Sequence, residues 1–105
     1  MILEECLRGG VFRVTSCDSC RRTVWPPSRY CSVCLGRTVL RPYRARGVVL
    51  EFSSRQGAVF CVCRFGGELN LMGRMTSDEC RVGMNVMISR CGMDDGRPVF
   101  EFAPL

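Results

Sequence analysis

Two pairs of cysteines in the first third of the chain constrain its fold more than any other feature. Cys17 and Cys20 form one Cys-x2-Cys pair, Cys31 and Cys34 form a second, and ten residues separate the pairs. This is zinc-ribbon spacing, in which each pair occupies one knuckle turn and the two knuckles face each other. Four thiolates at about 2.3 Å satisfy Zn²⁺ without help from a helix or a core. The spacing therefore predicts a four-cysteine metal site, with structural zinc favoured over iron or a redox dithiol.

The segment around these cysteines lacks the apolar residues of a hydrophobic core. Residues 11–46 hold short extended pieces, interrupted by Pro26-Pro27, and too few apolar side chains to build a core. Binding of structural zinc by such segments is worth about 10–16 kcal/mol, which is comparable with the stability of a whole small domain. We therefore expect a zinc ribbon over residues 11–46 that does not fold without metal. Because four protein thiolates close the coordination shell, this zinc should be structural rather than catalytic.

The number of cysteines and the N-terminal residues indicate the cellular compartment in which the protein resides. The chain has nine cysteines, an odd number that fits a framework of disulfide pairs badly. Residues 1–10 lack the apolar run of a signal peptide, and no stretch approaches a membrane span. We therefore expect a cytoplasmic protein with reduced thiols and no membrane partner. The cysteines outside the two pairs are interpreted as small buried hydrophobic residues: Cys6, Cys61, Cys63, Cys80 and Cys91.

The spacing of apolar runs and turn residues along the chain predicts a mostly β protein in three parts. Residues 1–10 should form a short helix that ends at Gly9 and Gly10, and the ribbon of residues 11–46, rubredoxin-like in type, follows. Residues 47–105 should form a five-stranded OB-fold barrel. The five strand-like runs are 47–53, 57–65, 68–75, 84–91 and 98–103. Between the third and fourth runs, residues 76–83 are expected to form one helical turn.

The absence of two residue types argues against catalysis by this chain. It contains no histidine, and all 15 of its basic residues are arginine. Serine–histidine and cysteine–histidine pairs, histidine-ligated metals and lysine Schiff bases are therefore excluded. The carboxylates also offer no catalytic pair. From the sequence we expect a protein that is not an enzyme.

Several motifs occur together along the chain: the two cysteine pairs with Trp25-Pro26-Pro27 between them, Gly47-Val48-Val49, and the run from Arg81 to Val86. With these motifs the chain resembles a known family, the acyl-CoA-associated zinc-ribbon/OB-fold proteins. The resemblance covers nearly the whole chain. Members of this family have an N-terminal helix and a ribbon before an OB-fold, and they accompany thiolase-fold enzymes without catalysing a reaction themselves.

The resemblance implies a specific function. Stand-alone archaeal members bridge acetoacetyl-CoA thiolase and 3-hydroxy-3-methylglutaryl-CoA synthase in the mevalonate pathway, so that the intermediate passes between the two enzymes. By this resemblance the chain would be a scaffold that helps to form a shared site for coenzyme A or acyl-CoA. The alternative is a nucleic-acid-binding protein, because zinc ribbons and OB-folds also occur there and residues 1–46 hold 9 arginines against 3 acidic residues.

Two sets of residues are candidates for contacts with ligand and partner. Arg41, Arg44 and Arg46 form the obvious cationic cluster for the phosphates of coenzyme A, although each could equally be a solvated surface charge. Phe60 and Val62 should lie on the face of their strand opposite to Cys61, so this strand is apolar on both faces. The outer face then needs a cover, either the ribbon or helix or a partner protein, and neither cover favours nucleic acid. The candidate partner contacts are Trp25, Pro26, Pro27, Phe60 and Val62.

Overall fold

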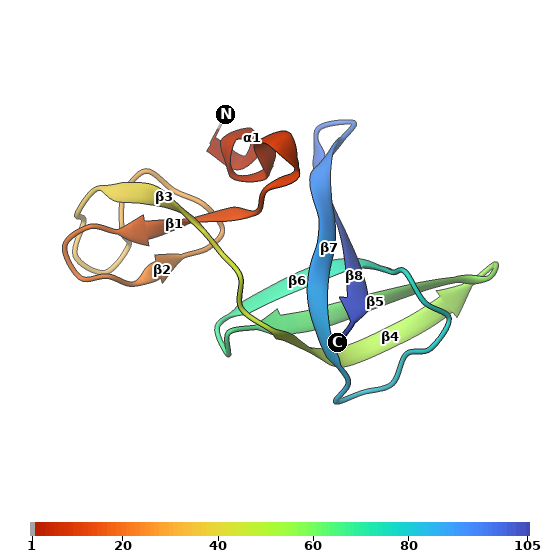
Figure 1. Ribbon diagram of the computed structural model, residues 1–105. Helices are drawn as coiled ribbons and strands as arrows, with labels where there is room; N and C mark the ends of the chain where they lie inside the picture. The colour runs from red at the N-terminus through yellow and green to blue at the C-terminus, as the bar shows by residue number, and fades with distance from the viewer. Residues whose placement is uncertain (1) are drawn as a thin grey trace. The chain divides into compact units, whose positions relative to one another are not determined.

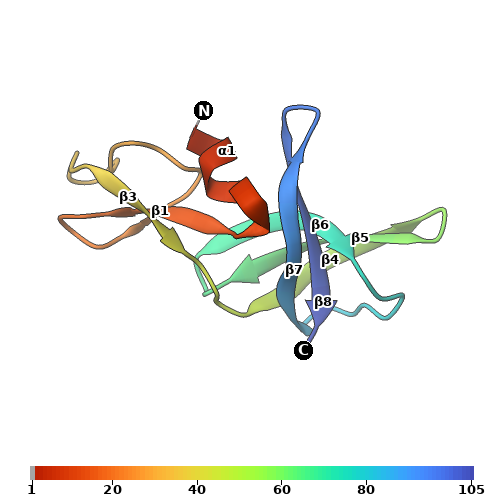
Figure 2. The same cartoon turned by 45° about the horizontal axis from the view of Figure 1, so that its top comes forward.

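The computed structural model describes residues 2–105 and divides the chain into two compact units (Figures 1 and 2). The first unit runs to Tyr43 and the second from Arg44 to Leu105. The chain is mostly β, with one short N-terminal helix, a ribbon and a five-stranded barrel, so the predicted fold class is confirmed. No helix among the described residues has the length and apolar character needed to cross a membrane.

The first unit begins with helix α1, Ile2–Leu7, followed by a 3₁₀ turn at Arg8–Gly10. Gly9 and Gly10 have φ angles of 69° and 74°, the left-handed conformation in which glycine carries no steric penalty. The predicted end of the helix at this glycine pair is therefore correct. Cys6 and Leu7 are buried, so the last turn of α1 provides apolar surface to the unit.

The ribbon sheet consists of β1 (Arg13–Cys17), β2 (Thr23–Val24) and β3 (Thr38–Pro42). The strand order is β2-β1-β3 and both pairings are antiparallel. Its apolar support is small, because outside the cysteines the buried hydrophobic side chains of this unit are Leu7, Phe12 and Val14. Phe12 packs edge-on against Trp25, with ring centroids 5.4 Å apart, and against Tyr43 at 5.8 Å.

The second unit is a closed barrel with the strand order β4-β5-β6-β8-β7. Its strands are β4 (Gly47–Arg55), β5 (Ala58–Phe65), β6 (Leu69–Met75), β7 (Asn85–Asp94) and β8 (Arg97–Pro104). The pairings are antiparallel except for a short parallel pairing of β6 with β8. Five strands closed in this order are the OB-fold arrangement that the sequence predicts.

Two phenylalanines and two glycines determine how tightly the barrel packs. The rings of Phe65 and Phe102 lie 5.3 Å apart, and both side chains are fully buried. A β-carbon at Gly47 would lie 2.6 Å from the ring of Phe65, and one at Gly73 would lie 2.8 Å from the ring of Phe102. Glycine at these two positions therefore lets the backbone approach the aromatic core.

The connection between β6 and β7 differs from its prediction. Residues 76–83 form bends and turns rather than a helical turn. Both ends of the segment are hydrogen bonded to barrel strands, through Thr76 N–H to the Phe102 carbonyl at 2.9 Å and Gly83 N–H to the Val49 carbonyl at 2.9 Å. These bonds hold backbone groups that a helix would need for its own hydrogen bonds.

Candidate functional site

The first knuckle is built around Cys17, the last residue of β1. The Cys17 sulfur accepts a hydrogen bond from the Cys20 N–H at 3.4 Å, and the Cys17 carbonyl accepts one from the Arg21 N–H at 2.9 Å. The Cys17 N–H donates to the Arg22 carbonyl at 2.8 Å, which closes the turn. Arg21 has a positive φ of 66°, because the chain must reverse directly after the second cysteine.

The second knuckle repeats this pattern around Cys31. The Cys31 sulfur accepts a hydrogen bond from the Val33 N–H at 3.4 Å, and its carbonyl accepts one from the Leu35 N–H at 2.9 Å. The Cys31 N–H donates to the Gly36 carbonyl at 2.8 Å, and Leu35 has a φ of 62°. A β-carbon at Gly36 would lie 3.3 Å from the Cys17 sulfur, so glycine lets the two knuckles approach each other.

The four sulfur atoms converge on one point. The sulfurs of Cys17 and Cys34 lie 3.4 Å apart, those of Cys20 and Cys31 lie 3.8 Å apart, and all four lie within 4.8 Å of one another. A tetrahedral ion with bonds of about 2.3 Å places its sulfur ligands about 3.8 Å apart. The arrangement therefore fits a tetrahedral ion such as Zn²⁺, and the four sulfurs would fill all of its positions.

The electrostatics of the cluster also suit a cation. The backbone N–H of Cys20 lowers the pKa of Cys17 to about 6, and the N–H groups of Cys34 and Val33 lower the pKa of Cys31. The pKa of Cys34 rises to about 11, because the thiol of Cys17 and partial burial outweigh the lowering by the Gly36 N–H. Four thiolates in one cluster repel one another, so a bound divalent cation would be needed to keep all of them ionised.

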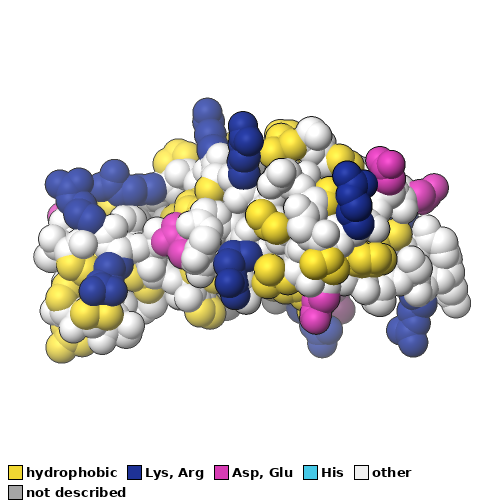
Figure 3. Space-filling view, turned by 90° about the horizontal axis from the view of Figure 1, so that it is seen from below, with side chains coloured by type: hydrophobic (Ala, Val, Ile, Leu, Met, Phe, Trp, Pro, Cys, Tyr) yellow, Lys and Arg dark blue, Asp and Glu magenta, His cyan; other side chains and the backbone are white. Residues whose placement is uncertain are grey.

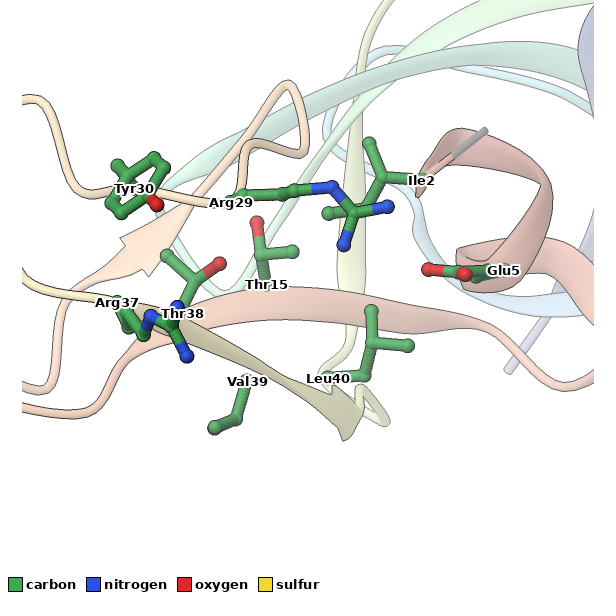
Figure 4. A pocket seen from close by; sticks show the side chains of 9 residues that line it. All are labelled: Ile2, Glu5, Thr15, Arg29, Tyr30, Arg37, Thr38, Val39 and Leu40. Atoms are coloured by element: carbon green, nitrogen blue, oxygen red, sulfur yellow. The ribbon is translucent and has the colours of Figure 1, made fainter.

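A pocket of about 310 Å³ lies in the first unit (Figure 4). Ile2 and Glu5 of α1 stand at one end, Leu40 and Val39 of β3 below, and Arg29 above. The other lining residues are Thr15, Tyr30, Arg37 and Thr38.

The charged groups that line this pocket are the guanidinium groups of Arg29 and Arg37 and the carboxylate of Glu5. The hydroxyls of Thr15 and Thr38 are already occupied, since they donate to the carbonyls of Val24 and Ser28. Neither Arg29 nor Arg37 forms an ion pair with a carboxylate of the described residues. Two guanidinium groups therefore remain available for hydrogen bonds to a ligand. Sequence reasoning assigned no pocket to these residues, because they come from separate segments and share no local motif.

The arginines predicted to contact coenzyme A lie on and after β3. Arg41 belongs to β3, whereas Arg44 and Arg46 belong to the stretch before β4, and all three side chains are exposed. None forms an ion pair with a described carboxylate. Their proposed contact with phosphate groups remains a prediction.

The predicted partner contacts divide between the two units. In the ribbon, Trp25 is half-buried against Phe12, Pro26 is exposed and Pro27 is half-buried. A hollow of about 330 Å³ beside the second knuckle is lined by Trp25, Pro26 and Tyr30 among others. Trp25 therefore packs within the ribbon and also lines a hollow on its surface.

In the barrel, strand β5 alternates as the sequence predicted. Cys61, Cys63 and Phe65 are buried inside. Phe60 is 43% exposed and Val62 is half-buried on the opposite face. Of the cysteines outside the knuckles, Cys6, Cys61, Cys63 and Cys91 are buried, as expected of small hydrophobic residues, and Cys80 is half-buried.

The ribbon and the overall fold are both similar to known proteins. Residues 7–40 match the family model described as ChsH2, rubredoxin-like zinc ribbon domain. That is a match to the segment that carries both knuckles. The whole chain also superposes on a chain of a solved structure entitled "Ltp2-ChsH2(DUF35) aldolase", with a TM-score of 0.75 and 16% identity, over 98% of this chain and 91% of that one. Among curated proteins, none matches the sequence.

These matches support part of the expected resemblance and correct another expectation. They support a ribbon of the ChsH2 type and a shared fold along almost the entire chain. The expectation that the chain is not an enzyme is contradicted, since the similar chain belongs to a structure named an aldolase. The physical reason is that the lack of histidine and lysine restricts only the chemistry of this chain's own side chains. It does not restrict catalysis at a site completed by a second chain.

Proposed function

We propose that this chain is a zinc-stabilised subunit of an enzyme assembly that acts on acyl-CoA thioesters. The observation that carries the proposal is the fold likeness over 98% of the chain to a chain of the Ltp2-ChsH2(DUF35) aldolase. The ChsH2 ribbon match at residues 7–40 and the motifs that resemble acyl-CoA-associated proteins support the same assignment. We place the protein in the cytoplasm, where its thiols would stay reduced.

The ribbon would contribute a fixed surface to such an assembly. The sulfurs of Cys17, Cys20, Cys31 and Cys34 would occupy every position of a tetrahedral zinc ion, so the metal would stabilise two loops and offer no position to a reactant. Arg41, Arg44 and Arg46 would bind the phosphate groups of coenzyme A, because guanidinium groups pair with phosphate through two parallel hydrogen bonds.

We further propose that the partner is a thiolase-fold enzyme. The chain would join acetoacetyl-CoA thiolase and 3-hydroxy-3-methylglutaryl-CoA synthase, as in the archaeal assemblies that its sequence resembles. Trp25, Pro26 and Pro27 would form one contact with the partner and Phe60 and Val62 another. Aromatic side chains are frequent anchors of such interfaces, and the proline pair limits the backbone freedom that binding must remove.

Isolation of the protein from its source cells tests the proposal. The protein is purified gently after nuclease treatment, and its companions are identified by mass spectrometry. Recovery of an acyl-CoA enzyme in fixed ratio is the expected result, and a thiolase together with the synthase would establish the more specific form. Recovery of nucleic acid or of polymerase-type partners would instead establish the alternative function.

A second experiment tests the coenzyme A contacts. In calorimetry on the purified assembly, exchange of Arg41, Arg44 and Arg46 for glutamine should weaken binding of coenzyme A about tenfold or more. The matched control exchanges Arg55, Arg81 and Arg97, three exposed arginines of the barrel, which removes the same charge elsewhere. Equal affinity of the two triple variants would remove the first three arginines from the site.

A further inference from the structure

The outer face of β4, β5 and β6 has an apolar centre. The register places Val62 of β5 between Glu51 of β4 and Met72 of β6. Two residues earlier on β5, Phe60 lies between Ser53 of β4 and Arg74 of β6. Phe60, Val62 and Met72 are therefore neighbours across two strands, and we call these three side chains the outer apolar cluster.

In the second unit, the outer apolar cluster is exposed and therefore accessible to a partner. Met72 is 71% exposed and Phe60 is 43% exposed, whereas their neighbours in sequence, Leu71 and Cys61, are buried inside the barrel. Val48 and Leu50 of β4 extend the exposed apolar surface. Figure 3 shows hydrophobic side chains exposed on one face of the molecule, with arginine and acidic side chains around them. Contiguous exposed apolar surface of this kind, surrounded by polar residues, is typical of a binding face.

Arginines stand at both ends of the cluster. Arg74 is paired with Phe60 at one end, and Arg64 is paired with Asn70 at the other, where its Nε donates to the Asn70 Oδ1 at 3.0 Å. Both side chains are exposed, and neither forms an ion pair with a described carboxylate. The register rows that contain the cluster hold two acidic side chains, Glu51 beside Val62 and Glu101 of β8 opposite Arg74. Glu101 forms an ion pair at 3.8 Å with Arg90 of β7, so the arginines around the cluster outnumber the carboxylates. A surface that complements this face therefore has an apolar centre and acidic groups at its edge.

The composition of the face argues for a protein rather than a nucleic acid. Base stacking on a strand surface needs several aromatic side chains in succession, whereas the cluster contains one aromatic ring with a valine and a methionine. Glu51, placed directly beside Val62, would repel a phosphate backbone. A folded protein surface can match apolar, cationic and anionic groups at the same time, with arginines at the rim.

We infer that the outer apolar cluster, with Arg64 and Arg74 at its ends, binds the enzyme subunit through a surface with an apolar centre and an acidic rim. This inference rests on the proposed function, since it names the face that the partner of the assembly occupies. The side chains of the cluster would be the central contacts, and the two arginines would orient the partner and speed its association.

The test uses the assembly purified from cells and then reconstituted from its separate chains. Met72→Glu introduces a charge at the most exposed position of the cluster, and we expect it to weaken partner binding at least about tenfold. The control is Met87→Glu on β7, since Met87 is also an exposed methionine, at 46%, and is not paired with β4, β5 or β6. It should change the affinity less than about twofold. Zinc content and circular dichroism establish that both variants fold.

Charge reversal provides an independent measurement. Arg64→Glu and Arg74→Glu should each weaken binding several-fold and reduce its dependence on salt, whereas Arg97→Glu at the tip of the β7–β8 hairpin should not. Hydrogen exchange on the complex should protect β5 and β6.

Each other outcome overturns the inference. A partner that binds Met72→Glu normally, with protection elsewhere, would refute this face while leaving the proposed function intact. Absence of any protein partner would refute both. Binding of a fluorescent single-stranded oligonucleotide that is lost in Phe60→Ser would assign the face to nucleic acid, and Met72-dependent self-association in sedimentation would assign it to a second copy.

Discussion

A methyl group added at Gly73 should destabilise the barrel strongly, because the space beside this glycine is already filled. Its β-carbon would lie 2.6 Å from the carbonyl oxygen of Phe100 and 2.8 Å from the ring of Phe102, whereas ordinary contact begins near 3.4 Å. Neither neighbour can move away easily. The first is backbone of β8, and the second is a fully buried ring packed on Phe65.

The expected magnitude follows from these two contacts. Overpacking of a core costs about 1–3 kcal/mol, and the stiffness of both neighbours places Gly73→Ala near the upper end. Alanine regains about 0.5–1 kcal/mol over glycine in a strand through the unfolded state, which leaves a net loss of about 2 kcal/mol. The control is Gly92→Ala on β7, where an added β-carbon meets nothing within 4 Å. This variant should keep or slightly raise the free energy of unfolding.

Urea unfolding of the zinc-loaded protein, followed by far-ultraviolet circular dichroism, provides the free energies. Hydrogen exchange of barrel amides assigns the change to the second unit, because the two units need not unfold together. If Gly73→Ala were as stable as Gly92→Ala, the close approach of β6 to the aromatic core would be refuted.

Three further predictions concern the metal centre and the core. Cys31→Ser should lose zinc and unfold the ribbon, whereas Cys91→Ser, at a buried thiol outside the cluster, should retain a full equivalent of metal by mass spectrometry. Phe65→Ala should cost about 3–5 kcal/mol in urea unfolding, since the side chain is fully buried. Burial raises the pKa of the Cys61 and Cys63 thiols, so at pH 9 both should be less ionised than a free thiol and should react with iodoacetamide more slowly in the folded than in the unfolded protein; equal labelling rates would contradict their burial.

The metal centre was predictable from the sequence because its geometry is local. Each knuckle forms through hydrogen bonds within six residues, as the bonds from Cys17 N–H to the Arg22 carbonyl and from Cys31 N–H to the Gly36 carbonyl show. Spacing alone therefore places two sulfurs on each turn. The strands of the barrel were predictable for a similar reason, since a period of two along β5 distinguishes the inner Cys61 and Cys63 from the outer Phe60.

Features that depend on distant segments could not be predicted in the same way. Residues 76–83 carry capping residues suited to a helical turn, yet bonds to Phe102 and Val49 take up the backbone at both ends. The pocket with Arg29 and Arg37 forms only where residues of α1 come close to residues of β3 (Figure 4). No local sequence pattern encodes that juxtaposition, because its residues are as far apart in the chain as Ile2 and Leu40.

The absence of histidine and lysine does not exclude an enzyme, but it determines which groups of the assembly can respond to pH. Every basic side chain of this protein is an arginine, and the guanidinium group stays protonated throughout the range in which proteins are folded. The cationic groups that this chain offers to ligand and partner are therefore guanidinium groups alone. A change of rate with pH in the proposed assembly should therefore originate in groups other than the basic side chains of this chain. Such groups are those of the partner, the phosphates of the substrate and the thiols of the cysteine cluster, where the pKa of Cys17 is about 6.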